Sequence, residues 1–244
     1  MSKRLKFFLT HLSISFIIAL LVMGLVFFIW YASPLASAVS VTQIFLMLLA
    51  IDVIVGPLLG WLVYKDGKKT LKFDLAVIII IQIAALCYGL FAIEQGRPAW
   101  LVFHADRFEL VRKNDLILEN IDQAHPQFQQ VSWIGPQFVA VKSATSTEQR
   151  QDDMFTEVLG GISVAQQPER YVELTQAKTQ IQQRALPLKE LEQYNSKTEV
   201  ERTLAKYPNA NAWLPLKANV VDMVVLINKE TAEVIKIVDL RPWN

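Results

Sequence analysis

The sequence has 244 residues, is 52% hydrophobic and carries a net charge of +1 at pH 7. These averages combine two unlike parts, because residues 1–93 hold 7 basic and 3 acidic residues whereas residues 94–244 hold 17 and 20. The slightly acidic second part argues against a nucleic-acid partner, and the single cysteine, Cys87, excludes an intrachain disulfide.

Three long apolar runs occupy about residues 7–31, 41–64 and 73–93. Each reaches the ~20 residues that a helix needs to cross ~30 Å of hydrocarbon, so we expect a transmembrane three-helix bundle over residues 1–96. The first run is also compatible with a cleaved signal peptide, since basic residues precede it and Ala36-Ser37-Ala38 offers small residues for cleavage. Its length, well above a ~7 to 15 residue signal core, favours a retained helix.

Basic residues flank these runs in two clusters, Lys3 to Lys6 and Lys65 to Lys72, whereas the connection from Ala32 to Ser40 has no charge. Cytoplasmic connections of membrane proteins carry an excess of lysine and arginine. The pattern therefore predicts a cytoplasmic N-terminus, and it places residues 97–244 on the far side of the membrane.

Polar residues inside the apolar runs need partners. Asp52 lies about eleven residues into the second run, where a carboxylate costs at least a few kcal/mol, so we expect it to be protonated or hydrogen-bonded. Gln82 on the third run and Ser13 or Ser15 on the first are the candidate partners. Gly56-Pro57, four residues later, predicts close helix approach and a kink or an opened carbonyl.

Asp52 has two possible roles. It is a proton or cation site in a small membrane transporter or channel subunit, or a hydrogen-bonded pin that fixes helix packing. A proton-driven transporter normally has further ionisable groups at midplane depth, and only Gln82 accompanies Asp52 there, so we favour the pin and keep the transporter as the alternative.

Asp74 follows Lys72 at the cytoplasmic end of the third run. A carboxylate near the start of a helix interacts favourably with the positive end of the helix dipole, so we expect Asp74 to mark the start of this helix.

Residues 97–244 read as an α+β soluble domain with a terminal antiparallel sheet. Ser196 and Glu199 have the spacing of a capping box at the start of a short helix. The polar stretch from Ser143 to Asp153 is the best candidate for a flexible loop. Helices are expected over 147–159, opened by Thr147 and closed by Gly160-Gly161, and over 175–184 and 188–194, separated by Pro187. Residues 99–105 and 108–111 read as an extended segment or a hairpin. Strands are expected over 137–142, 212–218, 222–227 and 233–240.

Motifs that carry catalysis or bind cofactors are missing from the sequence. It has no glycine-rich phosphate loop, no histidine pair at ligand spacing and no Gly-x-Ser-x-Gly elbow. His104 and His125 are isolated, which favours ordinary surface or core histidines over a metal site. We therefore expect neither an enzyme nor a bound cofactor or metal.

Five motifs lie in the apolar runs and at their ends. They are Arg4-Leu5-Lys6-x-Phe8, Ile51-Asp52-x3-Gly56-Pro57, Lys68-Lys69-x2-Lys72-x-Asp74, Gln82-x3-Leu86-x-Tyr88-Gly89 and Arg97-Pro98-x2-Leu101-Val102-Phe103-x2-Asp106-Arg107. Together these motifs resemble the TfpX/TfpZ family of type IV pilin accessory proteins. The resemblance covers about the first 110 residues and continues more loosely through Trp133 and Gly160-Gly161.

The resemblance implies a multi-pass protein of the bacterial inner membrane in Gram-negative species, with a periplasmic C-terminal domain. It implies a pilin-specific chaperone or assembly factor that binds its cognate major pilin and promotes type IV pilus assembly. Membrane lipids and the pilus assembly machinery are further candidate partners, and no cofactor or catalytic residue is implied. The family positions expected to have structural or partner-binding roles are Asp52, Gly56, Pro57, Asp74, Gln82, Arg97, Pro98, Asp106 and Arg107.

Overall fold

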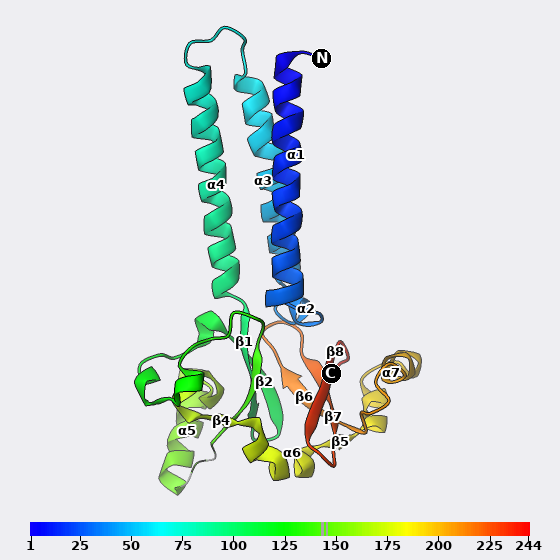
Figure 1. Ribbon diagram of the computed structural model, residues 1–244. Coiled ribbons are helices and arrows are strands. Elements are labelled where there is room, and N and C mark those ends of the chain that lie inside the picture. Colours follow the sequence, from blue (N-terminus) through cyan, green and yellow to red (C-terminus); the bar gives the residue numbers. More distant parts are fainter. Residues whose placement is uncertain (143, 145) are drawn as a thin grey trace. The chain divides into compact units, whose positions relative to one another are not determined.

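The structure is a computed structural model that describes residues 1–142, 144 and 146–244 (Figure 1). The chain forms two compact units, one of residues 1–36 and 40–96 and the other of residues 37–39 and 97–244. The first unit is helical and the second is an α+β domain, which confirms the predicted fold class.

The first unit contains three long helices. Helix α1 (Lys3–Gly24) continues into a six-residue π-helix, η1 (Leu25–Trp30), and α3 (Val41–Val63) and α4 (Leu71–Gln95) follow. A short helix, α2 (Leu35–Ala38), lies in the connection before α3. All three long helices are apolar enough and long enough to cross a membrane, which confirms the three predicted runs.

Helix α3 lies between α1 and α4 and packs against both. Direct contact between α1 and α4 is limited to a few residues, with Gln82 among them. Gly56-Pro57, where a kink or an opened carbonyl is expected, lies inside α3, which runs on through Pro57 to Val63. Proline has no N–H, so the carbonyl of Val53 one turn earlier loses its usual helical donor.

The second unit is built on one eight-stranded sheet of order β4-β3-β1-β2-β6-β7-β8, with β5 paired to β6 (Figure 1). β1 pairs in parallel with β3 and β2 with β6, and the other pairs are antiparallel. The terminal strands are antiparallel as predicted, and the β1–β2 hairpin joins the same sheet. The strands are β1 (Pro98–His104), β2 (Arg107–Arg112), β3 (Gln137–Val141), β4 (Tyr171–Glu173), β5 (Leu186–Pro187), β6 (Ala212–Lys217), β7 (Met223–Asn228) and β8 (Glu233–Val238).

Short helices fill the connections between the strands. The predicted helix over 175–184 starts as a 3-10 turn before α6, and the stretch 188–194 is 3-10 rather than α-helical. Pro187 forms part of β5, as a residue with no N–H can at a sheet edge. The α-helices are α5 (Thr147–Gly160), α6 (Lys178–Arg184) and α7 (Lys197–Leu204). The 3-10 helices are η2 (Lys113–Asp115), η3 (Ile121–Gln123), η4 (Pro126–Phe128), η5 (Val164–Gln166), η6 (Pro168–Arg170), η7 (Leu174–Ala177) and η8 (Leu188–Gln193).

Helix ends correct three details of the sequence reading. Ser146, rather than Thr147, caps α5, because its hydroxyl accepts a hydrogen bond from the main-chain N–H of Gln149 at 3.1 Å. At Ser196 the main-chain carbonyl, not the hydroxyl, accepts from Glu199 N, so the predicted capping box is wrong. Residues 147–153 of the predicted loop are helical, and Ser143 and Thr145 lie outside the described residues.

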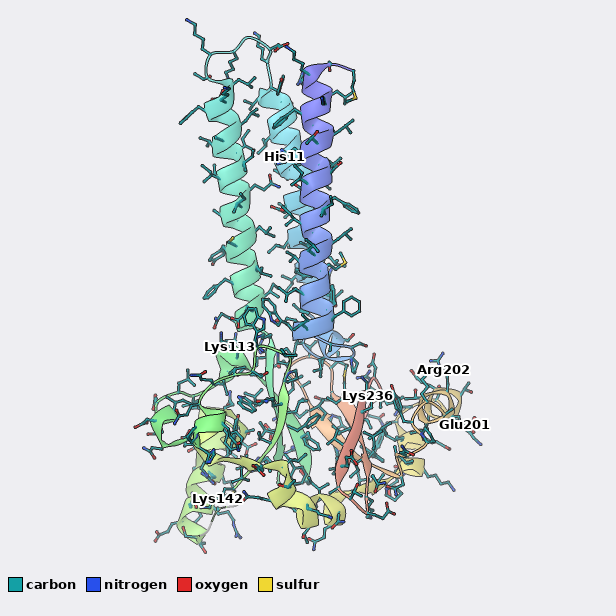
Figure 2. The ribbon with its side chains drawn as sticks, viewed as in Figure 1. His11, Lys113, Lys142, Glu201, Arg202 and Lys236 are labelled. Atoms are coloured by element: carbon teal, nitrogen blue, oxygen red, sulfur yellow. The ribbon has the colours of Figure 1, made fainter. Side chains whose placement is uncertain are left out.

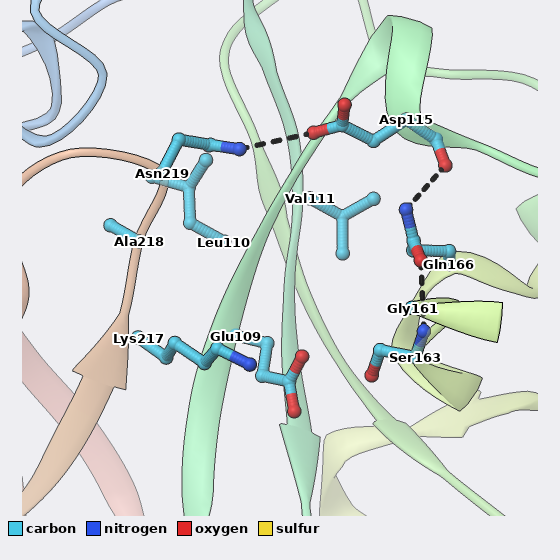
Figure 3. A pocket seen from close by; sticks show the side chains of 10 residues that line it. All are labelled: Glu109, Leu110, Val111, Asp115, Gly161, Ser163, Gln166, Lys217, Ala218 and Asn219. Carbon is cyan, nitrogen blue, oxygen red and sulfur yellow. Dashed lines mark hydrogen bonds between the residues drawn. The ribbon is translucent and has the colours of Figure 1, made fainter. Parts of the chain in front are cut away.

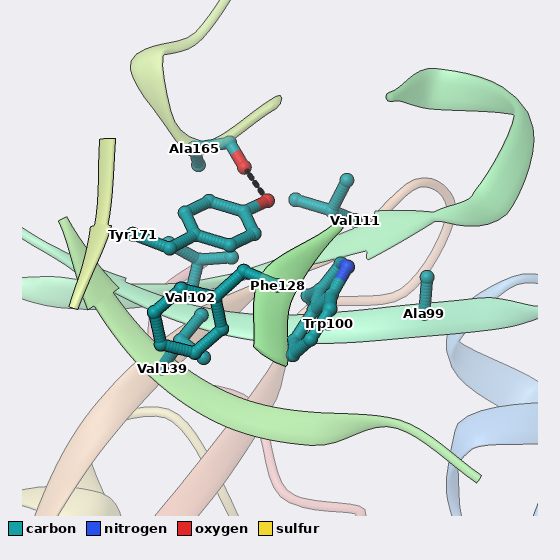
Figure 4. Close-up of a cluster of buried hydrophobic side chains, with 8 residues drawn as sticks. All are labelled: Ala99, Trp100, Val102, Val111, Phe128, Val139, Ala165 and Tyr171. Carbon is teal, nitrogen blue, oxygen red and sulfur yellow. Dashed lines mark hydrogen bonds between the residues drawn. The ribbon is translucent and has the colours of Figure 1, made fainter. Parts of the chain in front are cut away.

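Two clusters of buried apolar side chains, among those in the described residues, pack on the sheet. The first surrounds Trp100, whose ring lies 5.4 Å from that of Tyr171 and 5.9 Å from that of Phe128 (Figure 4). The second surrounds Trp213, whose Nε1 donates to the carbonyl of Pro187 at 2.9 Å. The first core belongs to the β4-β3-β1-β2 half of the sheet and the second to β6–β8, so the β2–β6 pair joins them.

Candidate functional site

Gln82 of α4 ties the three long helices together. Its Nε2 donates to the hydroxyl of Ser15 on α1 at 2.9 Å and to the main-chain carbonyl of Asp52 on α3 at 3.0 Å. Its Oε1 lies 2.9 Å from Nε2 of His11. His11 belongs to α1 and is labelled in Figure 2. A carbonyl only accepts, so the bond to Asp52 fixes the amide orientation and makes His11 Nε2 the donor. Gln82 and Ser15 meet beside Asp52 as predicted, but the hydrogen bond from Gln82 goes to the main-chain carbonyl of Asp52, whereas the expected acceptor was its carboxylate. Ser13 is exposed.

Gly56 makes room for this amide. A Cβ placed on Gly56 would lie 1.9 Å from Gln82 Oε1, which is far closer than an unbonded carbon and oxygen can approach. Gly56 and Pro57 are both buried, and Asp52 is half-buried one turn before them. The close approach predicted for the Gly56-Pro57 segment is therefore an approach of the Gln82 side chain to the α3 backbone.

An apolar groove of about 460 Å³ runs between α3 and α4. Its lining includes Ile44, Ile81 and Tyr88, which are exposed, so the groove is open along one side. Asp52 and Gln82 are the polar side chains in its wall. Three of the predicted site residues, Asp52, Gly56 and Gln82, thus lie together along this groove.

The other predicted residues lie elsewhere in the two units. Asp74 is in the first turn of α4, where its Oδ2 accepts from Thr70 Oγ1 at 2.9 Å and lies 2.7 Å from Lys68 Nζ. Arg97 is buried, and its carbonyl accepts from Lys113 N at 2.9 Å. The remaining three belong to the β1–β2 hairpin, with Pro98 at the start of β1, Asp106 in the exposed turn and Arg107 at the start of β2.

The second unit contains a polar pocket of about 200 Å³ that the sequence reading missed. It lies beside β2 and β6, and η5 closes one wall (Figure 3). The one available signal is Glu109, a charged residue within the otherwise apolar run from Phe108 to Val111. The pocket is lined by Glu109, Leu110, Val111, Asp115, Gly161, Ser163, Gln166, Lys217, Ala218 and Asn219.

Glu109 is a buried carboxylate, only 6% exposed. Its Oε1 lies 3.6 Å from His104 Nδ1 and 4.0 Å from Arg107 Nε, which are ion-pair distances rather than hydrogen bonds. Burial raises the pKa of Glu109, but polar contacts with His104 and Ser163 and the charge of Lys217 outweigh burial, so the pKa lies below its ordinary value of 4.5. Glu109 is therefore anionic at neutral pH.

Asp115 is the second carboxylate at this pocket. Arg112 binds it at both oxygens, with Nε 2.9 Å from Oδ2 and Nη2 2.8 Å from Oδ1. Burial raises the pKa of Asp115, but the hydrogen bonds and charge of Arg112 lower it by a larger amount. The pKa of Asp115 therefore lies below its ordinary value of 3.8. Across residues 1–142, 144 and 146–244, no three His, Cys, Asp or Glu residues gather in a way that could hold a metal ion.

The chain is similar to known proteins that are described as fimbrial assembly proteins. The family model of the fimbrial assembly protein FimB matches residues 1–40. The fimbrial assembly proteins of Dichelobacter nodosus serogroups I and E1 are 30% and 29% identical over 229 residues, covering 90% of this chain and 88% of each relative. That of serogroups C1 and C2 is 34% identical over 116 residues, covering 47% of this chain and 88% of the relative.

No solved structure matches the chain. The similarity to the serogroup I protein covers 90% of the chain and so extends over the three long helices and the α+β unit alike. The chain belongs to the family of fimbrial assembly proteins.

Proposed function

We propose that this protein is an inner-membrane accessory factor of type IV pili, of the TfpX/TfpZ kind, that binds its cognate major pilin and promotes pilus assembly. It acts by binding a partner and not as an enzyme. The observation that carries the proposal is the open apolar groove between α3 and α4. The names of its relatives, all fimbrial assembly proteins, supply the biological setting.

The groove suits an apolar helix. Ala85 and Ala92 lie two turns apart on α4, are exposed and line the groove. Small residues at a helix interface let membrane helices approach closely, so that van der Waals packing holds them together. A pilin that waits in the membrane before assembly would present one apolar helix of this kind, and the groove would receive it.

The proposed location follows from charge. The basic clusters at Lys3 to Lys6 and Lys65 to Lys72 put the N-terminus and the α3–α4 connection in the cytoplasm. Residues 97–244 then lie in the periplasm, where they meet the soluble part of the same pilin and select it. One chain thus offers a groove to the pilin stem and a folded domain to its head.

Two adjacent alanines on α4 test the groove. Ala84 and Ala85 are both exposed, but only Ala85 lines the groove. Ala85→Phe would fill the groove and should lower the amount of pilin that co-purifies with the tagged chain by about fivefold or more, since overpacking costs ~1 to 3 kcal/mol. Ala84→Phe adds the same ring outside the groove and should leave capture unchanged. Equal capture by both variants would show that the groove does not hold the pilin, as would lipid alone bound in it.

The transporter alternative rests on Asp52, which is half-buried in the groove wall. Asp52→Asn keeps the size of the side chain and removes its charge. The bond that Gln82 makes to residue 52 goes to the main chain, so it survives this substitution. The accessory function predicts normal piliation in this variant, whereas ion or proton transport through Asp52 predicts that piliation is lost.

A further inference from the structure

The sheet of the second unit opens where β2 meets β6. The two strands pair in parallel only at Phe108 with Leu216 and Glu109 with Lys217, and the polar pocket lies just beyond these pairs. Leu110 and Val111 both line it. Consecutive strand residues point to opposite faces, so a pocket that both residues line must also reach the main chain of β2 between them.

The side chains around this opening supply both donors and acceptors. Glu109 is 6% exposed, and its Oε1 accepts no hydrogen bond within the described part of the chain. Lys217 is exposed at the rim on the β6 side (Figure 3). The amides of Asn219 and Gln166 already bond to Asp115, and Gln166 also accepts from the main-chain N–H of Ser163.

Charges in the pocket are nearly balanced. Arg112 neutralises Asp115 through two charge-assisted hydrogen bonds. Arg107 lies 4.0 Å from Glu109 Oε1, but its Nε is also 3.8 Å from Asp106 Oδ1, so Asp106 balances its charge. Lys217 then balances Glu109, because it is the parallel neighbour of Glu109 on β6, although the two form no ion pair in the described structure. A neutral group that both donates and accepts therefore fits better than a cation or an anion, which would leave one of these charges uncompensated.

The size of the pocket restricts its occupant further. Its volume of about 200 Å³ is below the roughly 300 to 1,000 Å³ typical of sites for small-molecule ligands. A single side chain from another polypeptide is of the right size. An extended segment that carries this side chain could also pair with the open main chain of β2, as peptides do when they add to a sheet edge.

We propose that this pocket binds a carboxamide side chain, from asparagine or glutamine, on an extended segment of the pilin. The amide N–H donates to Glu109, and the amide oxygen accepts from Lys217. This inference rests on the proposed function, because it names the part of the pilin that the second unit recognises.

Site-specific crosslinking in the full-length protein tests the proposal. A benzophenone amino acid replaces Val220, an exposed residue next to the rim residue Asn219, in cells that make pili. Irradiation should crosslink the chain to the pilin, and mass spectrometry should place the crosslink beside an asparagine or glutamine in an extended segment. A crosslink to a segment without either residue would overturn the proposal.

Three variants test whether the crosslink depends on the pocket. Glu109→Gln and Lys217→Met should each lower the crosslink yield at least about tenfold, or ~1.4 kcal/mol. Lys236→Met removes an exposed lysine on β8, outside the pocket, and should change nothing. Lys217 is exposed, so its replacement leaves folding intact even if Glu109→Gln does not. Unchanged yields in both pocket variants would refute the proposal.

Co-purification of pilin with the unlabelled chain separates two kinds of failure. If pilin co-purifies but Val220 gives no crosslink to it, the pocket assignment is wrong and the proposed function stands. If pilin does not co-purify at all, the proposed function itself is wrong.

Discussion

Gly56 shows how one residue sets the packing of a membrane helix. Its missing Cβ leaves space for the Gln82 amide, which binds Ser15 and the Asp52 carbonyl at the same time. A polar group in hydrocarbon must find its partners inside the protein, so the glycine and the glutamine depend on each other.

Gly56→Ala should therefore destabilise the helical unit by about 1 to 3 kcal/mol, because the new methyl group displaces the Gln82 amide from its partners. Gly24→Ala is the matched control, since a Cβ at Gly24 meets nothing within 4 Å and alanine favours helix by roughly 1 kcal/mol. Thermal unfolding of the full chain in detergent, followed by circular dichroism, measures both. Equal melting temperatures for the two variants would contradict this account of Gly56.

Asp115 should make the stability of the second unit depend on pH. Its folded pKa lies below the ordinary value of 3.8, because Arg112 outweighs burial. A group with a lowered folded pKa stabilises the fold fully above its unfolded pKa, and that stabilisation is lost as the pH falls through the folded pKa.

Asp115→Asn should accordingly lower stability by about 1 kcal/mol at neutral pH, a modest value because the pair is partly exposed. The difference from the wild type should shrink as the pH falls below 3.8. Melting curves at a series of pH values measure it. Asp122→Asn, at an exposed acid of the same unit, is the control, and a difference that persists at the lowest pH would contradict the assignment.

Single residues differ in how far the sequence predicts their partners. Gln82 and Ser15 could be expected to meet near Asp52, because each is a polar residue in an apolar run with few possible partners. Glu109 could not be assigned, because its surroundings include Lys217, which is distant in the chain and comes near only through the β2–β6 pairing. No local pattern encodes that pairing.

An ion pair attaches the polar side of helix α5 to the rest of the second unit, whereas the apolar side of the helix is exposed. Arg170 donates from Nη1 to Asp153 Oδ1 at 3.0 Å and from Nη2 to Asp153 Oδ2 at 3.1 Å, which holds α5 near the start of β4. The large apolar residues of the helix that are exposed are Met154, Phe155, Val158 and Leu159. Because this helix buries little apolar surface, its attachment depends heavily on one bidentate ion pair.

Asp153→Asn should loosen α5 without unfolding the unit. Amide hydrogen exchange over residues 147–160 should become faster by about 5- to 10-fold, roughly 1 to 1.4 kcal/mol, because the amide side chain loses the charge of the pair. Exchange in the β1–β2 hairpin should not change. Glu157→Gln removes another charge from the same helix but leaves the Arg170 pair intact, and an equal effect there would refute the role of the pair.

Elements were predicted well where local pattern decides them. The β1–β2 hairpin and the strands β7 and β8 have short connections and apolar, β-branched residues, and the structure contains all of them. The stretch 188–194 is helical as expected, but the sequence does not specify the helix type, because the length and composition suit either, and the structure has the tighter 3-10 form.

The complete sheet depends on contacts between distant parts of the chain. β1 and β2 begin the second unit and β6 to β8 end it, yet the β2–β6 pair makes them one sheet. Sequence patterns identify each strand but carry no information on parallel pairing between strands a hundred residues apart. The two cores, around Trp100 and Trp213, depend on the same pairing, and the pocket lies where it ends.

The charge pattern also makes a prediction for the whole chain in its membrane. With Cys87 replaced by alanine, single cysteines at Ser33, Lys69 and Lys206 mark the first connection, the α3–α4 connection and the second unit, and all three positions are exposed. A membrane-impermeant maleimide should label Ser33→Cys and Lys206→Cys in spheroplasts, because the uncharged connection and residues 97–244 are expected in the periplasm. Lys69→Cys should be labelled only after lysis, since the basic cluster around it holds that connection in the cytoplasm. Labelling of Lys69→Cys in spheroplasts would contradict this topology, and the second unit would then be unable to meet the periplasmic part of a pilin.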